Sequence, residues 1–215
     1  MRAVPIQFIA ATGILALICG SAAAATITAT ASGSTTPSTT TVPGSIINGD
    51  FTITQLASSP GDSTLGNGLN EDTTWAFDFT SDPNFGSFSA SVPLASALLT
   101  LTLTTTFGID TDTVVIDGLP QFDSSAIRGL PVGVTQTVQL ELLDYYSSGA
   151  ILAAFSGGDF GKIPMIYSDD SIVSFARLTL APVPLPAAFP LFGTGLGLMG
   201  LFGLWRRRRA AAAAG

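Results

Sequence analysis

Histidine is absent from this 215-residue chain, and its single cysteine, Cys19, lies close to the N-terminus. These absences remove the imidazole base, the thiolate nucleophile and the Cys or His metal ligand from the rest of the chain. They also exclude an intramolecular disulfide. Acid–base or nucleophilic chemistry would have to use carboxylates, hydroxyls or lysine. The sequence therefore predicts no enzyme, no catalytic set, no metal site and no cofactor.

Basic residues are scarce as well, with 8 Lys and Arg against 15 Asp and Glu. All the acidic residues lie between Asp50 and Asp170, a region whose only nearby basic residues are Arg128, Lys162 and Arg177. The region between the two termini therefore has a formal net charge of −12, from 15 acidic and 3 basic residues. A field of this sign repels phosphate backbones, which excludes nucleic-acid binding.

The N-terminus has the three parts of a secretory signal peptide, which we assign to residues 1–25. A basic second residue precedes an apolar core, and Ala23 and Ala25 supply the small residues of a cleavage site. A lipoprotein signal at Cys19 is disfavoured because bulky Ile18 precedes that cysteine. We expect the chain to be exported.

The C-terminus contains an apolar stretch of the length that crosses a bilayer. No charge occurs from Pro186 to Trp205, and a spanning helix needs about 20 such residues. Trp205 falls at the expected headgroup level, and the four residues that follow remain on the cytoplasmic side by the positive-inside rule. Those residues are Arg206, Arg207, Arg208 and Arg209. The sequence predicts a transmembrane helix with its C-terminus inside the cell.

A short motif stands directly before this apolar stretch: Val183, Pro184, Leu185, Pro186, Ala187 and Ala188. Together with the apolar span and the arginine cluster, it resembles the VPLPA variant of the PEP-CTERM sorting signal. The commoner form of that signal has glutamate where this chain has Leu185. The resemblance covers residues 183–215 only. It implies recognition by an exosortase, a membrane cysteine transpeptidase of Gram-negative bacteria, which would cut near the motif and release or anchor the protein outside. The alternative is a permanent membrane anchor.

Between these ends, residues 26–44 are rich in Ser, Thr and Pro and are predicted to be a linker. Residues 45–182 form the expected folded domain, because apolar and polar residues alternate along several short segments separated by turn residues. We expect a single antiparallel β-sandwich with jelly-roll-like connections, and one short helix at Gly149–Phe155. The expected strands lie at Trp75–Thr80, Leu99–Thr104, Thr113–Ile116, Val138–Leu142, Ile163–Tyr167 and Ser171–Leu180.

Three groups of residues in this domain are candidates for chemistry or binding. Glycoside hydrolysis requires two facing carboxylates, for which the candidates are Glu71, Asp78, Glu141 and Asp144. Calcium binding requires clustered oxygen ligands, for which the candidates are Asp110, Asp112, Asp169 and Asp170. Stacking on sugars requires exposed aromatic rings, for which the candidates are Trp75, Tyr145, Tyr146 and Tyr167. Each group also has an ordinary structural explanation. The first carboxylates could lie on solvent-exposed strand faces, and the aspartates could form hydrogen bonds to their own backbone in turns. The aromatic residues could pack in the core, which is the role we favour for Trp75.

The sequence thus predicts a non-enzymatic cell-surface or extracellular-matrix protein with a structural or adhesive role. Its expected partners are an exosortase-like transpeptidase, the inner membrane while the C-terminal helix is present, and an exopolysaccharide. A carbohydrate-binding module or glycan-active enzyme delivered by the same signal is the alternative.

Overall fold

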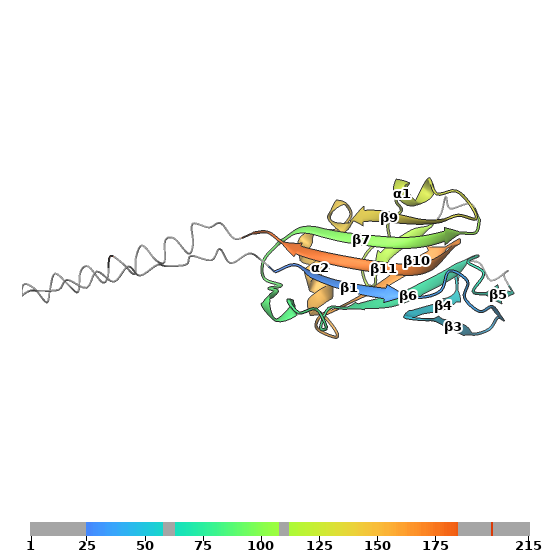
Figure 1. The fold of residues 1–215 in the computed structure, drawn as a ribbon, viewed down its shortest axis with the longest axis horizontal. Coiled ribbons are helices and arrows are strands. Elements are labelled where there is room, and N and C mark those ends of the chain that lie inside the picture. Colours follow the sequence, from blue (N-terminus) through green and yellow to red (C-terminus); the bar gives the residue numbers. More distant parts are fainter. Residues whose placement is uncertain (1–24, 58–62, 108–111, 185–198, 200–215) are drawn as a thin grey trace, which may run out of the picture. The chain divides into compact units, whose positions relative to one another are not determined.

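Two antiparallel sheets pack against each other in the computed structural model, which describes residues 25–57, 63–107, 112–184 and 199 (Figure 1). The described body belongs to one compact unit, Ala24–Pro184. The four-stranded sheet has the order β1-β11-β7-β9, and the five-stranded sheet has the order β3-β4-β6-β10-β8. The β-sandwich architecture predicted from the alternating pattern is confirmed.

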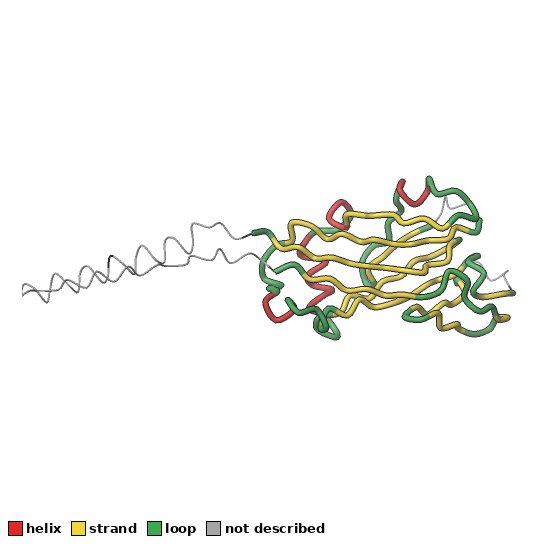
Figure 2. The backbone as a smooth tube through the Cα atoms, in the orientation of Figure 1, coloured by secondary structure: helices red, strands yellow, loops and turns green. Residues whose placement is uncertain are grey.

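The strands and helices have the following bounds. The four-stranded sheet contains β1 (Ile27–Ser32), β11 (Ser171–Pro182), β7 (Leu94–Thr105) and β9 (Thr135–Glu141). The five-stranded sheet contains β3 (Ser45–Asn48), β4 (Phe51–Gln55), β6 (Glu71–Asp78), β10 (Lys162–Asp169) and β8 (Thr113–Ile116). A small ladder joins β2 (Thr40–Thr41) to β5 (Thr64–Leu65). The helices, drawn in red in Figure 2, are η1 (Phe85–Ser87), α1 (Ser125–Arg128), η2 (Leu142–Asp144) and α2 (Ser148–Ser156).

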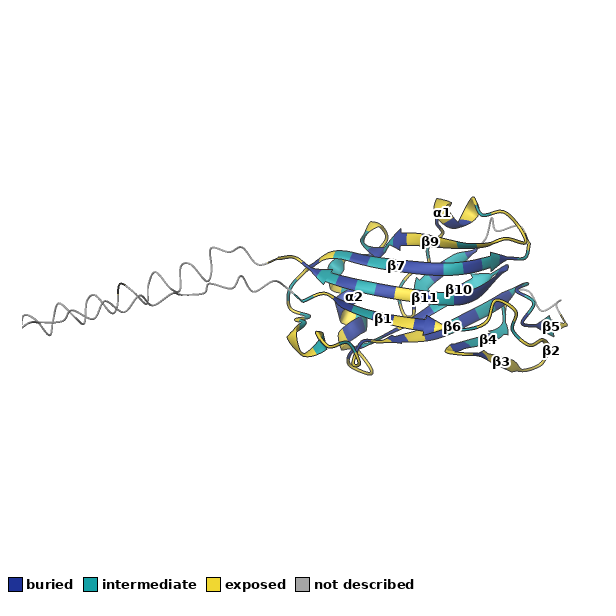
Figure 3. Cartoon of the chain, in the orientation of Figure 1, coloured by how far each residue is buried: buried dark blue, intermediate teal, exposed yellow. Residues whose placement is uncertain are grey.

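Alternation along the strands decides which side chains form the core. In β7, the side chains of Leu99, Leu101 and Leu103 are fully buried on the core face, while Thr102 on the opposite face is only partly buried. In β6, Trp75 and Phe77 point inward and their rings meet edge to face, 5.9 Å apart. Figure 3 shows the same alternation along the strands of both sheets. Branched and aromatic side chains suit such a half-buried pleated surface, so these predicted strands all form.

The predicted helix also forms, as α2. Ser147 is its N-cap, and the Ser147 hydroxyl accepts a hydrogen bond from the backbone N–H of Ala150 at 3.2 Å. This bond satisfies one of the backbone donors that every helix leaves free at its N-terminus.

The linker assigned to residues 26–44 is wrong for its first part, because Ile27–Ser32 is strand β1. Ile27, Ala29 and Ala31 are buried, at 0%, 5% and 1% exposure. The backbone of β1 pairs with β11 along its whole length. Small alanine and threonine side chains gave this segment the composition of a linker. Its place in the sheet comes from backbone hydrogen bonds to a strand about 150 residues away.

The free edge of β1 is covered by two carboxylates. The backbone N–H of Thr28 donates to Asp82 Oδ2, and that of Ser32 donates to Asp50 Oδ2, both at 2.8 Å. Charged groups on an edge strand discourage pairing with another chain. Asp82 and Asp50 therefore satisfy two backbone donors on the edge of this sheet.

Within the described ranges, no helix combines the length and the hydropathy that crossing a membrane requires. The predicted transmembrane segment, Pro186–Trp205, lies almost entirely outside these ranges, as do Arg206–Arg209.

Candidate functional site

The first and last strands of the sandwich are neighbours, and this decides where the two terminal segments attach. β1 and β11 run antiparallel, with Ile27 opposite Leu180. The start of β1 and the end of β11 therefore lie at the same end of the body (Figure 1). We call this the terminal end. The described residues nearest in sequence to the two predicted targeting segments, Ala25 and Pro184, are neighbours of these two strand ends along the chain.

The predicted sorting motif begins at the residue that follows β11, with no spacer. Pro182 ends β11 and is buried, opposite Leu94 of β7. The N–H of Val183 donates to the carbonyl oxygen of Pro93 at 2.8 Å, although 43% of Val183 is exposed. Pro184 is exposed. The other predicted residues, Ala23, Leu185, Pro186, Ala187, Ala188 and Trp205, lie outside the described residues, like the arginine cluster.

The carbonyl that holds Val183 is itself fixed to the core. Leu94, the residue after Pro93, donates its N–H to Ser148 Oγ at 2.7 Å. Ser148 opens α2, and α2 is anchored by the buried ring of Phe155. The start of the motif is thus tied through β7 and α2 to the interior of the sandwich. Nothing in the local sequence around Pro93 or Ser148 indicates this, because the contact joins segments about 90 residues apart.

A buried acidic network occupies the opposite end of the sandwich. Asp112 is fully buried and accepts hydrogen bonds from the Tyr167 hydroxyl, from Ser171 Oγ at 3.0 Å and from the N–H of Asp170 at 3.2 Å. Burial raises the pKa of Asp112, although these donors oppose the shift. Burial, with Asp112 alongside, also raises the pKa of Tyr167. Tyr167 therefore remains a neutral donor at ordinary pH.

Two further carboxylates at this end bond backbone groups of one turn. Glu71, 1% exposed, accepts from the N–H groups of Gly66, Asn67 (3.1 Å) and Gly68 (3.2 Å). Asp170 Oδ1 accepts from the N–H of Asn70 at 3.0 Å. The carboxylate oxygens of Glu71 and Asp170 thus serve as hydrogen-bond acceptors for the backbone N–H groups of this turn. Their hydrogen bonds give Asp112, Asp170 and Glu71 a structural role.

The calcium hypothesis receives no support from the described residues. No group of three or more Asp, Glu, His or Cys side chains in ranges 25–57, 63–107 and 112–184 is arranged to hold a metal ion. Asp110 lies outside these ranges.

The four candidate carboxylates for glycoside hydrolysis do not face one another. Glu71 and Asp78 lie at opposite ends of β6, about 23 Å apart along the strand. Asp78 is exposed, and hydrogen bonds from Thr80 lower its pKa. Glu141 accepts from Ser96 Oγ at 2.5 Å and from the Ala97 N–H at 2.6 Å, on the other sheet. Asp144 is exposed in η2. The interpretation that Asp78 and Glu141 alternate with buried residues on outer strand faces is confirmed.

The candidate aromatic residues are mostly interior. Trp75 is 5% exposed, which confirms its assignment to the core, and Tyr167 is fully buried. Tyr146 is 7% exposed and donates its hydroxyl to the Pro120 carbonyl oxygen at 2.7 Å. Tyr145 is 39% exposed, but its ring stacks on Phe122 at 3.9 Å. The paired tyrosines thus differ: one belongs to the core, and the other leaves one ring face for contact.

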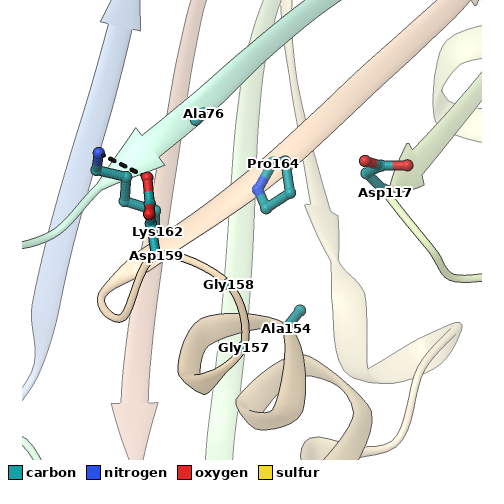
Figure 4. A pocket seen from close by; sticks show the side chains of 8 residues that line it. All are labelled: Ala76, Asp117, Ala154, Gly157, Gly158, Asp159, Lys162 and Pro164. Carbon is teal, nitrogen blue, oxygen red and sulfur yellow. Dashed lines mark hydrogen bonds and ion pairs between the residues drawn. The ribbon is translucent and has the colours of Figure 1, made fainter.

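An open hollow of about 380 Å³ lies beside the end of α2 (Figure 4). Its walls include Ala76, Pro164 and Ala154, with Asp117 at one side. At the other side Lys162 pairs with Asp159 at 3.3 Å. Both side chains of this ion pair are exposed to solvent.

The outer face of the four-stranded sheet is rich in hydroxyl groups and has one unpaired cation. The strand register places Thr30, Arg177, Thr100 and Gln139 in one row across the sheet, in which Thr100 is itself buried at 4% exposure. The adjacent row contains Ser32, Phe175, Thr102 and Thr137. Arg128 and Lys162 form ion pairs with aspartates, whereas exposed Arg177 forms none with any described residue. We call this surface the Arg177 face.

Comparisons with protein-family models, with curated proteins and with solved structures give no match to this chain.

Proposed function

We propose that this chain is an exported, non-enzymatic protein of the bacterial cell surface or extracellular matrix, sorted through its C-terminal segment by an exosortase-like transpeptidase. The precursor is held in the inner membrane by residues 183–215 until the motif is processed. The observation that carries this proposal is the terminal end: β1 begins beside the end of β11, and the predicted motif starts at the residue that follows β11.

Jelly-roll-like connections account for this arrangement, and we propose them as the finer description of the fold. From β6 to β11, successive strands alternate between the two sheets. Beside β8, Phe122 forms an isolated antiparallel bridge with Val114 of β8. In such a fold the first and last strands are neighbours, which supports a body that is attached to the membrane by one end.

The hydrogen bonds of the candidate carboxylates support a non-enzymatic role. Glu71 is buried and accepts hydrogen bonds from three backbone N–H groups, and Glu141 accepts from Ser96 and Ala97 on the other sheet. A glycosidase requires one carboxylic acid and one carboxylate on the two sides of the scissile bond. A structural or adhesive role requires no such pair.

Intact mass spectrometry of the protein from its host tests the sorting proposal. In a host with the transpeptidase, we expect a mature mass that lacks residues 1–25 and the segment beyond the motif. In a host that lacks the enzyme, the membrane-bound precursor should accumulate.

A matched pair of variants sharpens this test. Replacing Leu185 and Pro186 by alanine should block processing, whereas replacing Gly215 should leave it unchanged. Identical mature masses with and without the enzyme would contradict the sorting proposal and favour a permanent anchor.

The Arg177 face favours a second proposal, that the body contacts an exopolysaccharide. Threonine hydroxyls both donate and accept hydrogen bonds, as sugar hydroxyls do. A guanidinium group adds several donors in a fixed plane. Phe175, half-buried beside Arg177, offers an apolar surface to a sugar ring.

Affinity electrophoresis in gels that contain the host's own polysaccharide tests this contact. We expect the wild-type body to be retarded and Arg177→Ala to lose most of the retardation, because the only unpaired cation of the face is removed. Arg128→Ala, which removes an ion-paired arginine elsewhere, should behave like the wild type. Equal mobility of all three proteins in the presence and absence of glycan would contradict the proposal.

A further inference from the structure

We propose that the hollow beside the end of α2 binds a protonated amino-sugar residue of a glycan chain. The hollow measures about 380 Å³ and lies between α2 and the outer face of β6 and β10 (Figure 4). Neither the terminal end nor the Arg177 face contributes a residue to it. The inference therefore stands or falls separately from the two proposals above.

The floor of the hollow is an apolar surface of the size of a single ring. Ala76 and Pro164 are opposite each other in the ladder between β6 and β10, and both are exposed on the outer face of the sheet. Ala154 of α2 adds a third apolar wall, and Gly157 and Gly158 border the hollow without side chains that would fill it. A sugar ring presents C–H groups on its faces, which pack on such a surface. The volume lies near the lower end of the range for small-molecule sites, about 300–1,000 Å³, so it fits one sugar residue of a longer chain.

Backbone hydrogen bonds hold the walls of the hollow in place. The N–H of Asp117 donates to the carbonyl oxygen of Pro164 at 3.0 Å, which fixes the start of one wall to the floor. The N–H of Lys162 donates to the carbonyl oxygen of Asp159, also at 3.0 Å, which fixes the opposite wall. A ligand that enters the hollow therefore does not have to order these segments, and that lowers the entropy cost of binding.

The side chains around the floor have an excess of negative charge. Asp117 lies on one side of Pro164, and the ion pair of Lys162 with Asp159 lies on the other (Figure 4). The two charges of that pair offset each other, whereas Asp117 forms no ion pair with any residue in the described ranges. The formal charge of −12 on the whole body adds a field of the same sign. The hollow thus favours an ammonium group and disfavours a carboxylate, phosphate or sulfate.

The placement of the acceptors favours an amino sugar over the lysine side chain of a basic protein. Carboxylate oxygens are available at both sides of the floor, on Asp117 and on Asp159. A lysine side chain has donors at its tip only, so it would use one side. An amino sugar has donors around the whole ring: its ammonium group can bond Asp117 while its hydroxyl groups bond Asp159. Hydrogen bonds between charged groups are stronger than neutral ones, so the ammonium contact should dominate the affinity.

Isothermal titration calorimetry of the full-length protein, purified in detergent, tests this site. The probes are a tetrasaccharide of glucosamine, at a slightly acidic pH that protonates its amines, and the same tetrasaccharide with every amine N-acetylated. We expect the acetylated form to bind at least about ten-fold more weakly, because acetylation removes the positive charge that Asp117 accepts.

Four variants locate the binding. Asp117→Asn should weaken binding of the glucosamine tetrasaccharide about five- to ten-fold. Asp144→Asn makes the same change of net charge at an exposed carboxyl outside the hollow, and it should leave the affinity unchanged. Lys162→Gln should tighten binding, since the lysine repels the ammonium group. Ala154→Leu fills the hollow without a change of charge and should weaken binding. Thermal melting confirms that each variant is folded.

Three results would overturn the inference. The first is the absence of measurable heat with the wild-type protein and the glucosamine tetrasaccharide. The second is an equal loss of affinity in Asp117→Asn and Asp144→Asn, which would show a general attraction to the acidic body in place of a site. The third is a tetralysine peptide that binds as tightly as the tetrasaccharide and competes with it, which would assign the hollow to a basic protein segment. A loss confined to Asp117→Asn and Ala154→Leu, together with a preference for the free amine, supports the amino-sugar site.

Discussion

Phe155→Ala should lower the free energy of unfolding of the body by about 3–5 kcal/mol, the usual cost of deleting a buried aromatic ring. Phe155 is 1% exposed and lies on the inner side of α2. Its ring lies within 6.1 Å, centroid to centroid, of four others: Phe79, Phe85, Phe88 and Phe160. Removal leaves a cavity that α2 cannot fill, because its first residue, Ser148, is bound to Leu94. We expect the melting temperature to fall by roughly 10 °C in a domain of this size.

Phe160→Ala is the matched control, since Phe160 contacts the same ring cluster but is 59% exposed. Its expected loss is below about 1 kcal/mol. Urea unfolding of the purified body measures both variants. Equal losses for the two variants would show that the ring cluster is not part of the cooperative core.

Asp112→Ala should destabilise the body by about 2–4 kcal/mol, because it removes a buried carboxylate that accepts hydrogen bonds from several buried donors. Those donors are the Tyr167 hydroxyl, the Ser171 hydroxyl and the N–H of Asp170. Asp112→Asn retains one acceptor oxygen and removes the buried charge, so its loss should be smaller. Urea unfolding at neutral pH gives both values, and a larger loss for the asparagine variant than for alanine would contradict this account.

The contribution of Asp112 to the stability of the body changes with pH in a definite direction. Burial raises the pKa of Asp112 above its ordinary value of 3.8, so the fold favours the protonated form. The stabilisation from protonated Asp112 is complete at a pH below the pKa that Asp112 has in the unfolded chain. It is lost as the pH rises through the pKa that Asp112 has in the folded protein. The wild type should therefore gain stability relative to Asp112→Asn as the pH falls from about 7 towards about 4.

Asp78 provides a control of opposite sign. Hydrogen bonds from Thr80 lower the pKa of this exposed carboxyl, so its contribution is present above the unfolded pKa and is lost as the pH falls through the folded pKa. The wild type should lose stability relative to Asp78→Asn over the acidic range. Unfolding curves measured at several pH values give both differences, and trends of the same sign would contradict the assignments.

Alternation along the chain was sufficient to predict most of the sandwich. Leu99, Leu101 and Leu103 are large and regularly spaced, so burial of one strand face follows from their local pattern alone. The same argument fails for Ile27–Ser32, whose small side chains bury little area. Its order comes from pairing with β11, and no local pattern encodes that partner.

Among the candidate residues too, some positions follow from the local sequence pattern and others depend on tertiary contacts. Trp75 was assigned to the core because it alternates with polar neighbours, and it lies there. Tyr145 and Tyr146 are adjacent, so local sequence does not distinguish the exposed ring from the buried one. That difference depends on Phe122 and Pro120, which reach the two tyrosines from an earlier loop.

The amino-acid sequence by itself determined the absence of His and Cys chemistry, the acidic charge of the body, the alternating strands and the two apolar terminal segments, because composition and local spacing carry that information. Only the tertiary structure decided that β1 begins beside the end of β11, that Asp112 accepts a hydrogen bond from Tyr167, and that Val183 donates one to Pro93. Each of these depends on which strands become neighbours. Sheet order is set by the packing of the whole core, and residues far apart in sequence meet only after that packing has formed.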